Sequence, residues 1–535
     1  MMTNNNKAPP KSLTSVAEIG EVATWYDGRT IFITGGTGFM GKVLIEKLLY
    51  ACPGVARIYV LMRSKKGKTP EARIEEMWKL PMFQRLRKTY PDSIKKIVPL
   101  YGDIVSDNLG LTVTSKARLH AEVSVVFHCA ATLKLEANLK DSIDQNTGGT
   151  LRVLNLCKEM KQLEAFVHLS TAFCCCDVHD LQEKVYATSD NPQDVIQVSQ
   201  WLRMDALEVA TPKLIAPHPN TYTYSKRLAE VLVAEHFPDL PISIVRPSIV
   251  TPSWEEPIPG WVDSLNGPVG ILVGAGKGVI RSMHCRSDYN AHIIPVDFAI
   301  NGLITIAWRT ATASPKPREI PVYNLTNHST LPITWGEVLV KGRVVGRKYP
   351  FEMCLWYPDG NMRNSRAVHN FFAFFFHFLP AYFIDFLMII FLQKRFMVRI
   401  YKKVAMGLDL LQFFTTRQWK FNDKNYLSLW KTVNAEDRRR FPSDFSQLNT
   451  DEYLKRIVLG ARQYCMKEDP KTIGKCRVQH FFLYLLDRSV ALFFYGSIIW
   501  FLINYFESTR MLFDSATEYI KEIPFAENLV AKLKE

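Results

Sequence analysis

The chain has 535 residues, of which 47% are hydrophobic and 22% are charged, and its formal net charge is +14. It is too long for one compact core, so we expect two or three domains, and the composition suits a globular protein with some membrane character. No short lysine- and arginine-rich block occurs, so we attribute the positive charge to a membrane surface and a phosphate-rich cofactor and substrate, and not to nucleic acid.

The first residues are polar and contain no apolar run, which predicts no secretory signal peptide. We expect residues 1–25 to form a flexible leader. The ten cysteines, including the run 174–176, show no paired C-x-x-C spacing. This disfavours zinc and suits reduced thiols facing the cytosol, so the sequence predicts no metal site.

The first strongly patterned stretch predicts a strand, a tight turn and a helix. A β-branched and aromatic run, 30–34, ends in glycines, and helical apolar spacing follows over 42–49. Gly35 suits the turn, Gly38 lets the main chain approach a pyrophosphate, and Gly41 lets helix and strand pack closely. We predict a dinucleotide site here, with a structural turn of the same shape as the alternative. The expected cofactor contacts are Thr34, Gly35, Thr37, Gly38, Phe39, Met40 and Gly41.

Further apolar runs at 56–62, 97–104, 123–131 and 165–173 predict buried strands. Helical stretches separate them, and such alternation is typical of βαβ units. The sequence therefore predicts an α/β fold, a Rossmann-type doubly wound parallel sheet with helices on both faces.

The ends of these strands supply further cofactor candidates. Arg63 and other basic residues follow the second strand, where a 2′-phosphate would sit, so we prefer NADPH over NADH. A solvated basic loop is the alternative. The third strand ends in a Gly-Asp pair that brings Asp103, followed by Ile104, to the adenine. The fourth ends in small residues, Ala130 among them, across which the cofactor can lie, and we expect His128 there to be structural.

A Tyr-x-x-x-Lys pattern supplies the candidate catalytic pair. Tyr222 and Lys226 are four residues apart and share one helix face. We expect Lys226 to lower the pKa of the Tyr222 phenol and to hold the nicotinamide ribose, so that the phenol can donate a proton to a carbonyl oxygen. A hydroxyl at the end of the preceding strand would orient the same oxygen. A surface pair is the alternative, but the glycine motif favours catalysis.

These motifs resemble the extended short-chain dehydrogenase/reductases and, among them, the alcohol-forming fatty acyl-CoA reductases of animals. The resemblance is carried by residues 34–41, 167–172, 220–226, 244–250 and 276–278, and it extends over nearly the whole chain. It implies that NADPH reduces a long-chain fatty acyl-CoA to a primary alcohol through an aldehyde, with release of CoA. The spacing of the motifs alone supports only carbonyl reduction.

The resemblance also implies roles for single residues. It places the catalytic hydroxyl at Thr171, with Ser170 as the alternative. Asn146 matches an asparagine that supports the lysine and a bound water, and a helix cap is the alternative for it. The turn that begins at Arg246 would lie beside the nicotinamide, and we expect Asp297 to be a cap and not a catalytic group.

We expect the reductase domain over 26–350, and the resemblance implies a mostly helical second domain over 351–465. Within it, the apolar run 371–392 is long enough to cross a bilayer, but it contains a proline, a histidine and an aspartate, which are costly in lipid. We therefore expect this run to line an apolar channel or to lie against the membrane.

The C-terminal part predicts a membrane anchor. We expect a basic linker and pre-membrane helix over 466–488, a single transmembrane helix over 489–506 and a tail over 507–535, with a buried amphipathic hairpin as the alternative to the span. Basic residues gather upstream, so the catalytic domains should face the cytosol. The tail has no peroxisomal tripeptide, which favours the endoplasmic reticulum over the peroxisome. Oligomeric state stays open.

Two other functions stay open. One is a membrane-bound dehydrogenase of a sterol, another lipid or a sugar nucleotide on the same fold, which would not need the second domain. The other is a non-catalytic lipid-binding or scaffold protein, which the intact Tyr222–Lys226 pair argues against.

Overall fold

The computed structural model describes residues 20–505 except 66 and 328, together with 507, 511, 514 and 515. Its centre is a sheet of seven parallel strands in the order β11-β7-β5-β4-β1-β2-β3. The strands are β1 (Thr30–Thr34), β2 (Arg57–Met62), β3 (Ile97–Tyr101), β4 (Val123–His128), β5 (Ala165–Leu169), β7 (Ile242–Pro247) and β11 (Val322–Leu325). The predicted doubly wound α/β fold is confirmed.

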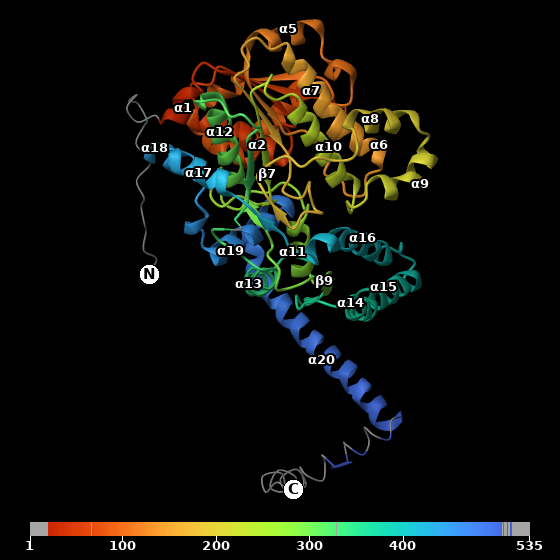
Figure 1. Cartoon of the computed structure of the whole chain (residues 1–535). Coiled ribbons are helices and arrows are strands. Elements are labelled where there is room, and N and C mark those ends of the chain that lie inside the picture. Colours follow the sequence, from red (N-terminus) through yellow and green to blue (C-terminus); the bar gives the residue numbers. More distant parts are fainter. Residues whose placement is uncertain are drawn as a thin grey trace, which may run out of the picture.

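Helices cover both faces of this sheet (Figure 1). Successive residues of a strand point to opposite faces, so Ile31 and Ile33 of β1 pack in one core and Phe32 packs in the other. The first core includes α2 (Phe39–Ala51) and α12 (Val296–Thr312), and the second includes α5 (Val113–Glu122), α7 (Gly149–Lys158) and α10 (Thr221–Glu235). Burial on both faces explains why the strands are continuous apolar runs.

Other elements surround this centre. Apart from α1 (Glu21–Trp25), the other described α-helices before residue 350 are α3 (Pro70–Trp78), α4 (Gln84–Thr89), α6 (Leu139–Ser142), α8 (Pro192–Trp201), α9 (Met204–Leu214), α11 (Pro268–Gly276) and α13 (Trp335–Lys348). Three short parallel pairs join distant segments: β6 (Asp180–Leu181) with β13 (Lys420–Phe421), β8 (Ile249–Thr251) with β10 (Ile293–Pro295), and β9 (Ser282–His284) with β12 (Asn361–Arg363).

The end of the predicted leader is part of the folded body. Residues Glu21–Trp25 form helix α1, in which Val22 and Ala23 are buried, and the Val22 amide donates to the Asp437 carboxylate at 2.9 Å. The flexible leader is therefore a wrong prediction for these residues, because their apolar side chains have a surface to pack on. The preceding part of the predicted leader, residues 1–19, lies outside the described residues.

The C-terminal part is helical, as predicted, but most of it returns to the reductase body. The helices α17 (Lys424–Thr432), α18 (Ala435–Arg440) and α19 (Thr450–Gly460) lie against that body. Tyr426, Phe441 and Leu454 of this region belong to the same hydrophobic core as Ile31 of the central sheet. Much of the region 351–465 thus shares a core with the reductase part, while Ala381, Met397 and Tyr401 form a small buried cluster of their own.

A helical hairpin projects from the body between these segments (Figure 1). One arm runs through α14 (Arg366–Ala373), a π-helical turn (Phe374–Phe378) and α15 (Leu379–Ile390), and the other arm is α16 (Met397–Thr415).

The apolar run 371–392 is largely exposed on this hairpin, with Phe383 60% and Leu392 94% accessible. The prediction that it lines an internal apolar channel is therefore wrong, while contact with a membrane stays open. The polar residues in the run have partners: Asp385 accepts three main-chain N–H groups of residues 396–398, and His377 accepts the Arg281 amide at 2.8 Å.

The last described element is one continuous helix, α20 (Ile473–Tyr505), which extends away from the body (Figure 1). The amphipathic hairpin considered for this region is therefore wrong. Two segments, Arg366–Ile390 and Pro470–Tyr505, are long and apolar enough to cross a membrane, and only 22% and 6% of their most apolar windows are buried. Such exposed apolar helices point to membrane association. The predicted tail, 507–535, lies almost entirely outside the described residues.

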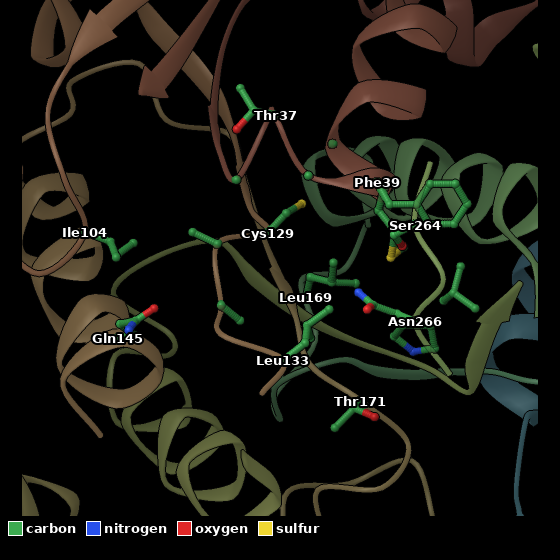
Figure 2. Close-up of a pocket in the computed structure, with 18 of the residues that line it drawn as sticks. Thr37, Phe39, Ile104, Cys129, Leu133, Gln145, Leu169, Thr171, Ser264 and Asn266 are labelled. Atoms are coloured by element: carbon green, nitrogen blue, oxygen red, sulfur yellow. The ribbon is translucent and has the colours of Figure 1, made fainter. Parts of the chain in front are cut away.

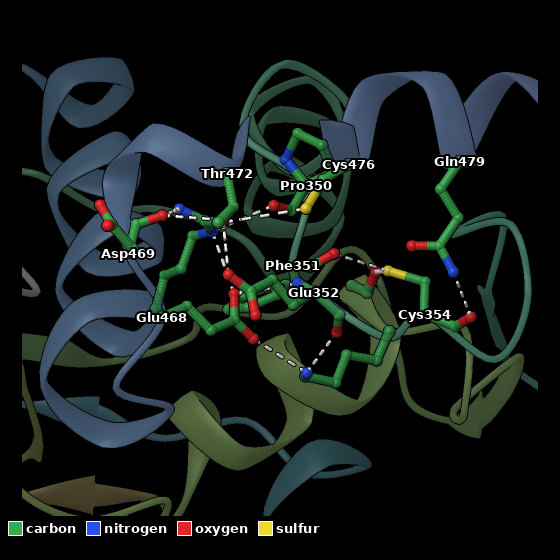
Figure 3. Close-up of polar contacts among 12 residues, drawn as sticks. Pro350, Phe351, Glu352, Cys354, Glu468, Asp469, Thr472, Cys476 and Gln479 are labelled. Atoms are coloured by element: carbon green, nitrogen blue, oxygen red, sulfur yellow. Dashed lines mark hydrogen bonds and ion pairs between the residues drawn. The ribbon is translucent and has the colours of Figure 1, made fainter. Parts of the chain in front are cut away.

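Buried charges fix the start of α20 to the body (Figure 3). Glu468 forms ion pairs with Lys277 and with Arg462, each at 3.0 Å. Arg462 is 2% exposed and also donates to the carbonyl oxygens of Pro350 and Asp469. The projecting helix is thus connected to the segments that end α11 and α19.

Candidate active site

A cavity of about 490 Å³ lies at the carboxyl ends of the central strands (Figure 2). Loops after six strands line it, as expected for ligand sites in doubly wound sheets. Most of the predicted cofactor and catalytic residues line this cavity: Gly35, Thr37, Gly38, Phe39, Met40, Gly41, Arg63, Asp103, Ile104, Ala130, Thr171, Tyr222 and Lys226.

The glycine turn leaves no room for side chains. Gly35 has φ +73°, and a Cβ there would lie 2.7 Å from the Ala130 nitrogen. A Cβ at Gly41 would lie 2.3 Å from the Gly35 carbonyl oxygen. Gly38 precedes the first residue of α2, whose end has no side-chain cap, so main-chain N–H groups at this helix end stay available. The bare turn and the helix dipole together fit a pyrophosphate.

Thr34 does not line the cavity, which corrects the prediction of a cofactor contact. It is fully buried, and its hydroxyl lies 2.8 Å from His128 Nδ1 and accepts the Ala130 amide at 3.2 Å. Thr34 therefore supports the main chain on which the cofactor was expected to lie. His128 also contacts Thr150 at 3.0 Å, and burial lowers its pKa to about 3, which keeps the ring neutral, as expected for a structural histidine.

Three cationic side chains gather at one end of the cavity. Arg63 pairs with Asp103 at 3.2 Å, and Arg73 donates to the Thr37 hydroxyl at 3.2 Å. Lys65 also lines the cavity. Burial and the neighbouring Arg63 lower the pKa of Arg73, so a bound anion would relieve their repulsion. This group of charges suits a phosphate beyond the pyrophosphate site.

The Tyr222–Lys226 pair begins α10, where Asn220 caps the helix by accepting the Thr223 amide at 3.0 Å. Lys226 is 2% exposed, donates to the Leu169 carbonyl oxygen at 2.6 Å and thereby fixes the end of β5. Burial lowers the pKa of Lys226 to about 8, so its ammonium is charged at neutral pH.

The expected acidification of the Tyr222 phenol is wrong for this structure. Burial raises the pKa of the phenol, and a hydrogen bond with Thr171 only partly offsets the rise. The ammonium of Lys226 is engaged by Leu169 and is no cause of this shift. The phenol is consequently a neutral hydrogen-bond donor at physiological pH, and Thr171 is its hydroxyl partner. Thr171 lines the cavity (Figure 2).

Asn146 contacts α10 next to Lys226, on the side away from the cavity. It lies within a π-helical turn, Ile143–Gly148, so the helix-cap alternative is wrong. Its side chain donates to the Ser225 hydroxyl at 2.9 Å and accepts the Thr132 amide at 2.8 Å. Asn146 itself is buried outside the cavity wall, whereas its neighbour Gln145 lines the wall (Figure 2).

The comparisons with known proteins agree with this site. Two family models described as male sterility protein match residues 33–303 and 376–468, and the first is an NAD-binding domain. Fatty acyl-CoA reductase 1 of Mus musculus is 36% identical and that of Homo sapiens is 35% identical over 456 residues, which are 85% of this chain and 88% of each relative. The chain belongs to the fatty acyl-CoA reductase family. Its cofactor is a nicotinamide nucleotide.

Solved structures share the fold. The reductase domain of a nonribosomal peptide synthetase from Mycobacterium tuberculosis matches with a TM-score of 0.54 at 15% identity, over 84% of this chain and 96% of that chain. The terminal R domain from the myxalamid biosynthetic pathway matches with a TM-score of 0.52 at 17% identity, over 83% and 93%. At such identities the likeness concerns the fold alone.

The turn at the end of β7 lies at the cavity wall through Pro247 and Ser248, and not through Arg246. Arg246 does not reach the cavity, because it is fully buried in an ion pair with Glu230, at 2.5 Å between Nη2 and Oε2. Pro247 and Ser248 line the cavity in its place, and the Ser248 hydroxyl has no hydrogen-bond partner among the described residues. A buried hydroxyl without a partner fits a polar ligand in this position.

Asp297 is not the expected helix cap, because Pro295 is the N-cap of α12 and Asp297 is the second residue of the helix. Its carboxylate accepts the main-chain N–H groups of Trp254, Glu255 and Glu256 at 2.8–3.1 Å, while burial raises its pKa to about 6. It therefore holds the loop over 254–256 against the first turn of α12.

Proposed function

We propose that this chain uses NADPH to reduce a long-chain fatty acyl-CoA to a primary alcohol. The observation that supports this most directly is that Tyr222, Lys226 and Thr171 share one cavity with the glycine turn and with the cations around Arg63. Family membership supplies the acyl-CoA as the substrate class.

In the proposed reaction, two hydroxyl side chains of this protein bind the substrate oxygen. Thr171 and Tyr222 hold the thioester oxygen, and their hydroxyls stabilise the negative charge that grows on it. Each of the two reductions would take one hydride from a bound NADPH, so the oxidised nucleotide must leave and a second NADPH must bind before the second reduction. Collapse of the first tetrahedral adduct breaks the carbon–sulfur bond and releases CoA as a thiolate, leaving an aldehyde.

The second reduction needs a proton donor. Because its pKa is raised, the Tyr222 phenol keeps its proton until the aldehyde oxygen becomes negative, and it then donates that proton to give the alcohol. Thr171 would stabilise the phenolate that remains, because its hydrogen bond lowers the pKa of the phenol. Lys226, charged and one turn away on the same helix, would hold the nicotinamide ribose. Asn146 would act as a positioning residue, because it contacts Ser225 next to this lysine.

The preference for NADPH is proposed from the charges at the cavity. Arg63 and Arg73 both line the cavity and would supply the contacts to a 2′-phosphate, and Asp103 forms an ion pair with Arg63 alone. Arg63→Ala should raise the KM for NADPH about tenfold or more and leave the KM for NADH nearly unchanged, since a hydrogen-bonded contact between charged groups accounts for about 1.5–3 kcal/mol. Arg57→Ala at the opposite end of β2 is the matched control. Equal changes for both nucleotides would refute this assignment.

The membrane arrangement is also a proposal. We infer that α20 is a single membrane span, that the hairpin of α14–α16 lies against the same bilayer, and that the reductase body faces the cytosol at the endoplasmic reticulum. The exposure of both apolar segments supports this arrangement. Protease added outside sealed microsomes should digest the body completely, and protection of the body would contradict the orientation.

The test of the reaction uses the full chain purified in detergent, a C16 acyl-CoA and NADPH, with lipid extracts analysed for aldehyde and alcohol. We expect alcohol and free CoA from the wild type and a loss of at least a hundredfold in Tyr222→Phe. Tyr224→Phe is the matched control, because its hydroxyl donates to Asp190 at 2.8 Å and does not line the cavity. Full activity in a folded Tyr222→Phe protein would refute the mechanism.

A further inference from the structure

A second, apolar cavity adjoins the cofactor cavity. The two share Thr251 and Val269 in their walls. The walls of the second cavity come mainly from α11, α13 and α19 and from the segment 351–362 that leads to the hairpin. They include Leu272, Met283, Trp335, Leu339, Leu454 and Ile457. Arg343 also lies in the wall, but its guanidinium donates to the Gly360 carbonyl oxygen at 2.7 Å. The environment therefore suits a hydrocarbon chain.

The glycines in this wall are of two kinds. A Cβ at Gly276 would lie 2.7 Å from the Phe351 ring, and one at Gly360 would lie 2.5 Å from the Ile280 carbonyl oxygen, so close packing requires glycine there. Gly342 and Gly346 differ, because a Cβ at either position would meet nothing within 4 Å. Both lie in the interior of α13, and Gly346 is nevertheless buried.

Two glycines inside one helix weaken it, and packing does not require them here. They are four residues apart, so they share a helix face and lie about 6 Å apart along the axis. Both glycines line the apolar cavity. Because neither has a side chain, α13 leaves space open on the side that faces this cavity.

We propose that this cavity holds the acyl chain and that the open faces of Gly342 and Gly346 set the chain length that the enzyme accepts. The inference rests on the proposed function, since it names the site for the hydrocarbon part of that substrate. The shared wall residues Thr251 and Val269 are where the chain passes from the cofactor cavity into the acyl cavity.

The cavity has a free volume of about 110 Å³, which is smaller than a long acyl chain. We therefore expect Met283 and Met362 in its wall to change rotamer when a chain enters, because methionine side chains adapt to irregular shapes. In a cavity of this size, a leucine side chain at either glycine would take up much of the space.

The experiment compares the full-length wild type with Gly342→Leu and Gly346→Leu on saturated acyl-CoA substrates from C8 to C18, with NADPH and alcohol formation as the readout. Each methylene removed from an apolar site costs about fourfold in binding. We expect kcat/KM for the longest chains to fall at least tenfold relative to the shortest, with the C8 rate unchanged and a smaller effect for Gly346→Ala. Gly407→Leu is the matched control, because that helical glycine also meets nothing within 4 Å but does not line the cavity.

The outcomes separate this inference from the proposed function. A wild type that reduces no acyl-CoA of any length would refute the function itself. An active wild type whose length profile is unchanged in both leucine variants would overturn the acyl-chain assignment. Equal loss at every chain length, in a variant that still binds NADPH and unfolds at the wild-type temperature, would overturn it as well. A change in the Gly407→Leu profile would show that helix stabilisation, and not cavity filling, is the cause.

Discussion

The buried ion pair between Glu230 and Arg246 allows a quantitative test of how the active site is held together. Glu230 lies on α10, two turns after Tyr222, and Arg246 is in β7 directly before the cavity residue Pro247. Both side chains are at most 1% exposed, and the guanidinium makes two contacts with the carboxylate, at 2.5 and 2.9 Å. The pair therefore connects the helix of the catalytic residues to a strand of the cavity wall.

The expected effect of Glu230→Gln follows from this burial. Burial acts to raise the pKa of Glu230, but Arg246 outweighs it and the pKa is lowered, so both groups are charged. Glutamine keeps the shape of the side chain but leaves the guanidinium as an unpaired buried charge, which costs about 3–5 kcal/mol. For a folded body that spans residues 21–465, with about 2.1 cal/mol/K of unfolding entropy per residue, the melting temperature should fall by roughly 3–6 °C. Thermal unfolding of the detergent-solubilised protein, followed by fluorescence, measures the shift.

Two comparisons decide whether the reasoning holds. Glu164→Gln breaks the exposed ion pair with Arg29 and should cost less than about 1 kcal/mol, because solvent screens that pair. A double variant, Glu230→Leu with Arg246→Met, should recover much of the stability lost in Glu230→Gln, since no buried charge remains. If Glu230→Gln and Glu164→Gln lose the same amount, or if the double variant is less stable than Glu230→Gln, the buried pair does not stabilise the fold as we argue.

Two further predictions concern pH. Because burial lowers the pKa of Lys226 to about 8, kcat/KM should fall above pH 8 as the ammonium loses its proton, and Lys226→Arg should move that decline to higher pH; a profile flat to pH 10 would contradict this. Burial acts to raise the pKa of Glu256, but Lys47 and Arg85 outweigh burial and lower the pKa to about 2. The ionised Glu256 therefore stabilises the folded state fully above the unfolded pKa near 4.5, and this stabilisation is lost as the pH falls toward 2. The difference in unfolding free energy between wild type and Glu256→Gln should thus be constant above pH 5 and shrink below pH 4, and a difference independent of pH would refute it.

The central fold could be predicted because the information is local. Strands covered on both faces are continuous apolar runs, and the glycine turn between β1 and α2 lies in one short stretch. The edge strand β11, the last strand of the central sheet in chain order, was not predicted, since its four residues are too few to show a hydrophobic period. Helix α1 was missed for a similar reason: its five residues gain their stability from α12 and Asp437, which are far away in the sequence.

The site was predicted less completely, because side-chain direction depends on tertiary contacts. Thr34 belongs to the turn motif, yet its hydroxyl is engaged by His128 inside the sheet. Arg73 lies in a helix that carries no motif, and Gln145 was passed over for its neighbour Asn146, so only the structure identifies both as cavity residues. The basic residues that follow the second strand were the available signal for a phosphate site, and they indicated the loop that begins at Arg63 and not the helix that carries Arg73.

The proposed location of the acyl chain shows why hydrophobicity alone misleads. The run 371–392 is the most obviously apolar part of the middle of the chain, but it faces outward and its one carboxylate, Asp385, is satisfied by main-chain N–H groups. An apolar run indicates that residues avoid water, and it does not distinguish a lipid bilayer from a protein cavity. The apolar cavity instead arises where α13 lacks side chains, at Gly342 and Gly346, and an absent side chain leaves no hydropathy signal. The two features make opposite predictions: polar substitutions in the exposed run should weaken membrane binding at constant chain-length preference, whereas filling the glycine gaps should change that preference and leave membrane binding as it is.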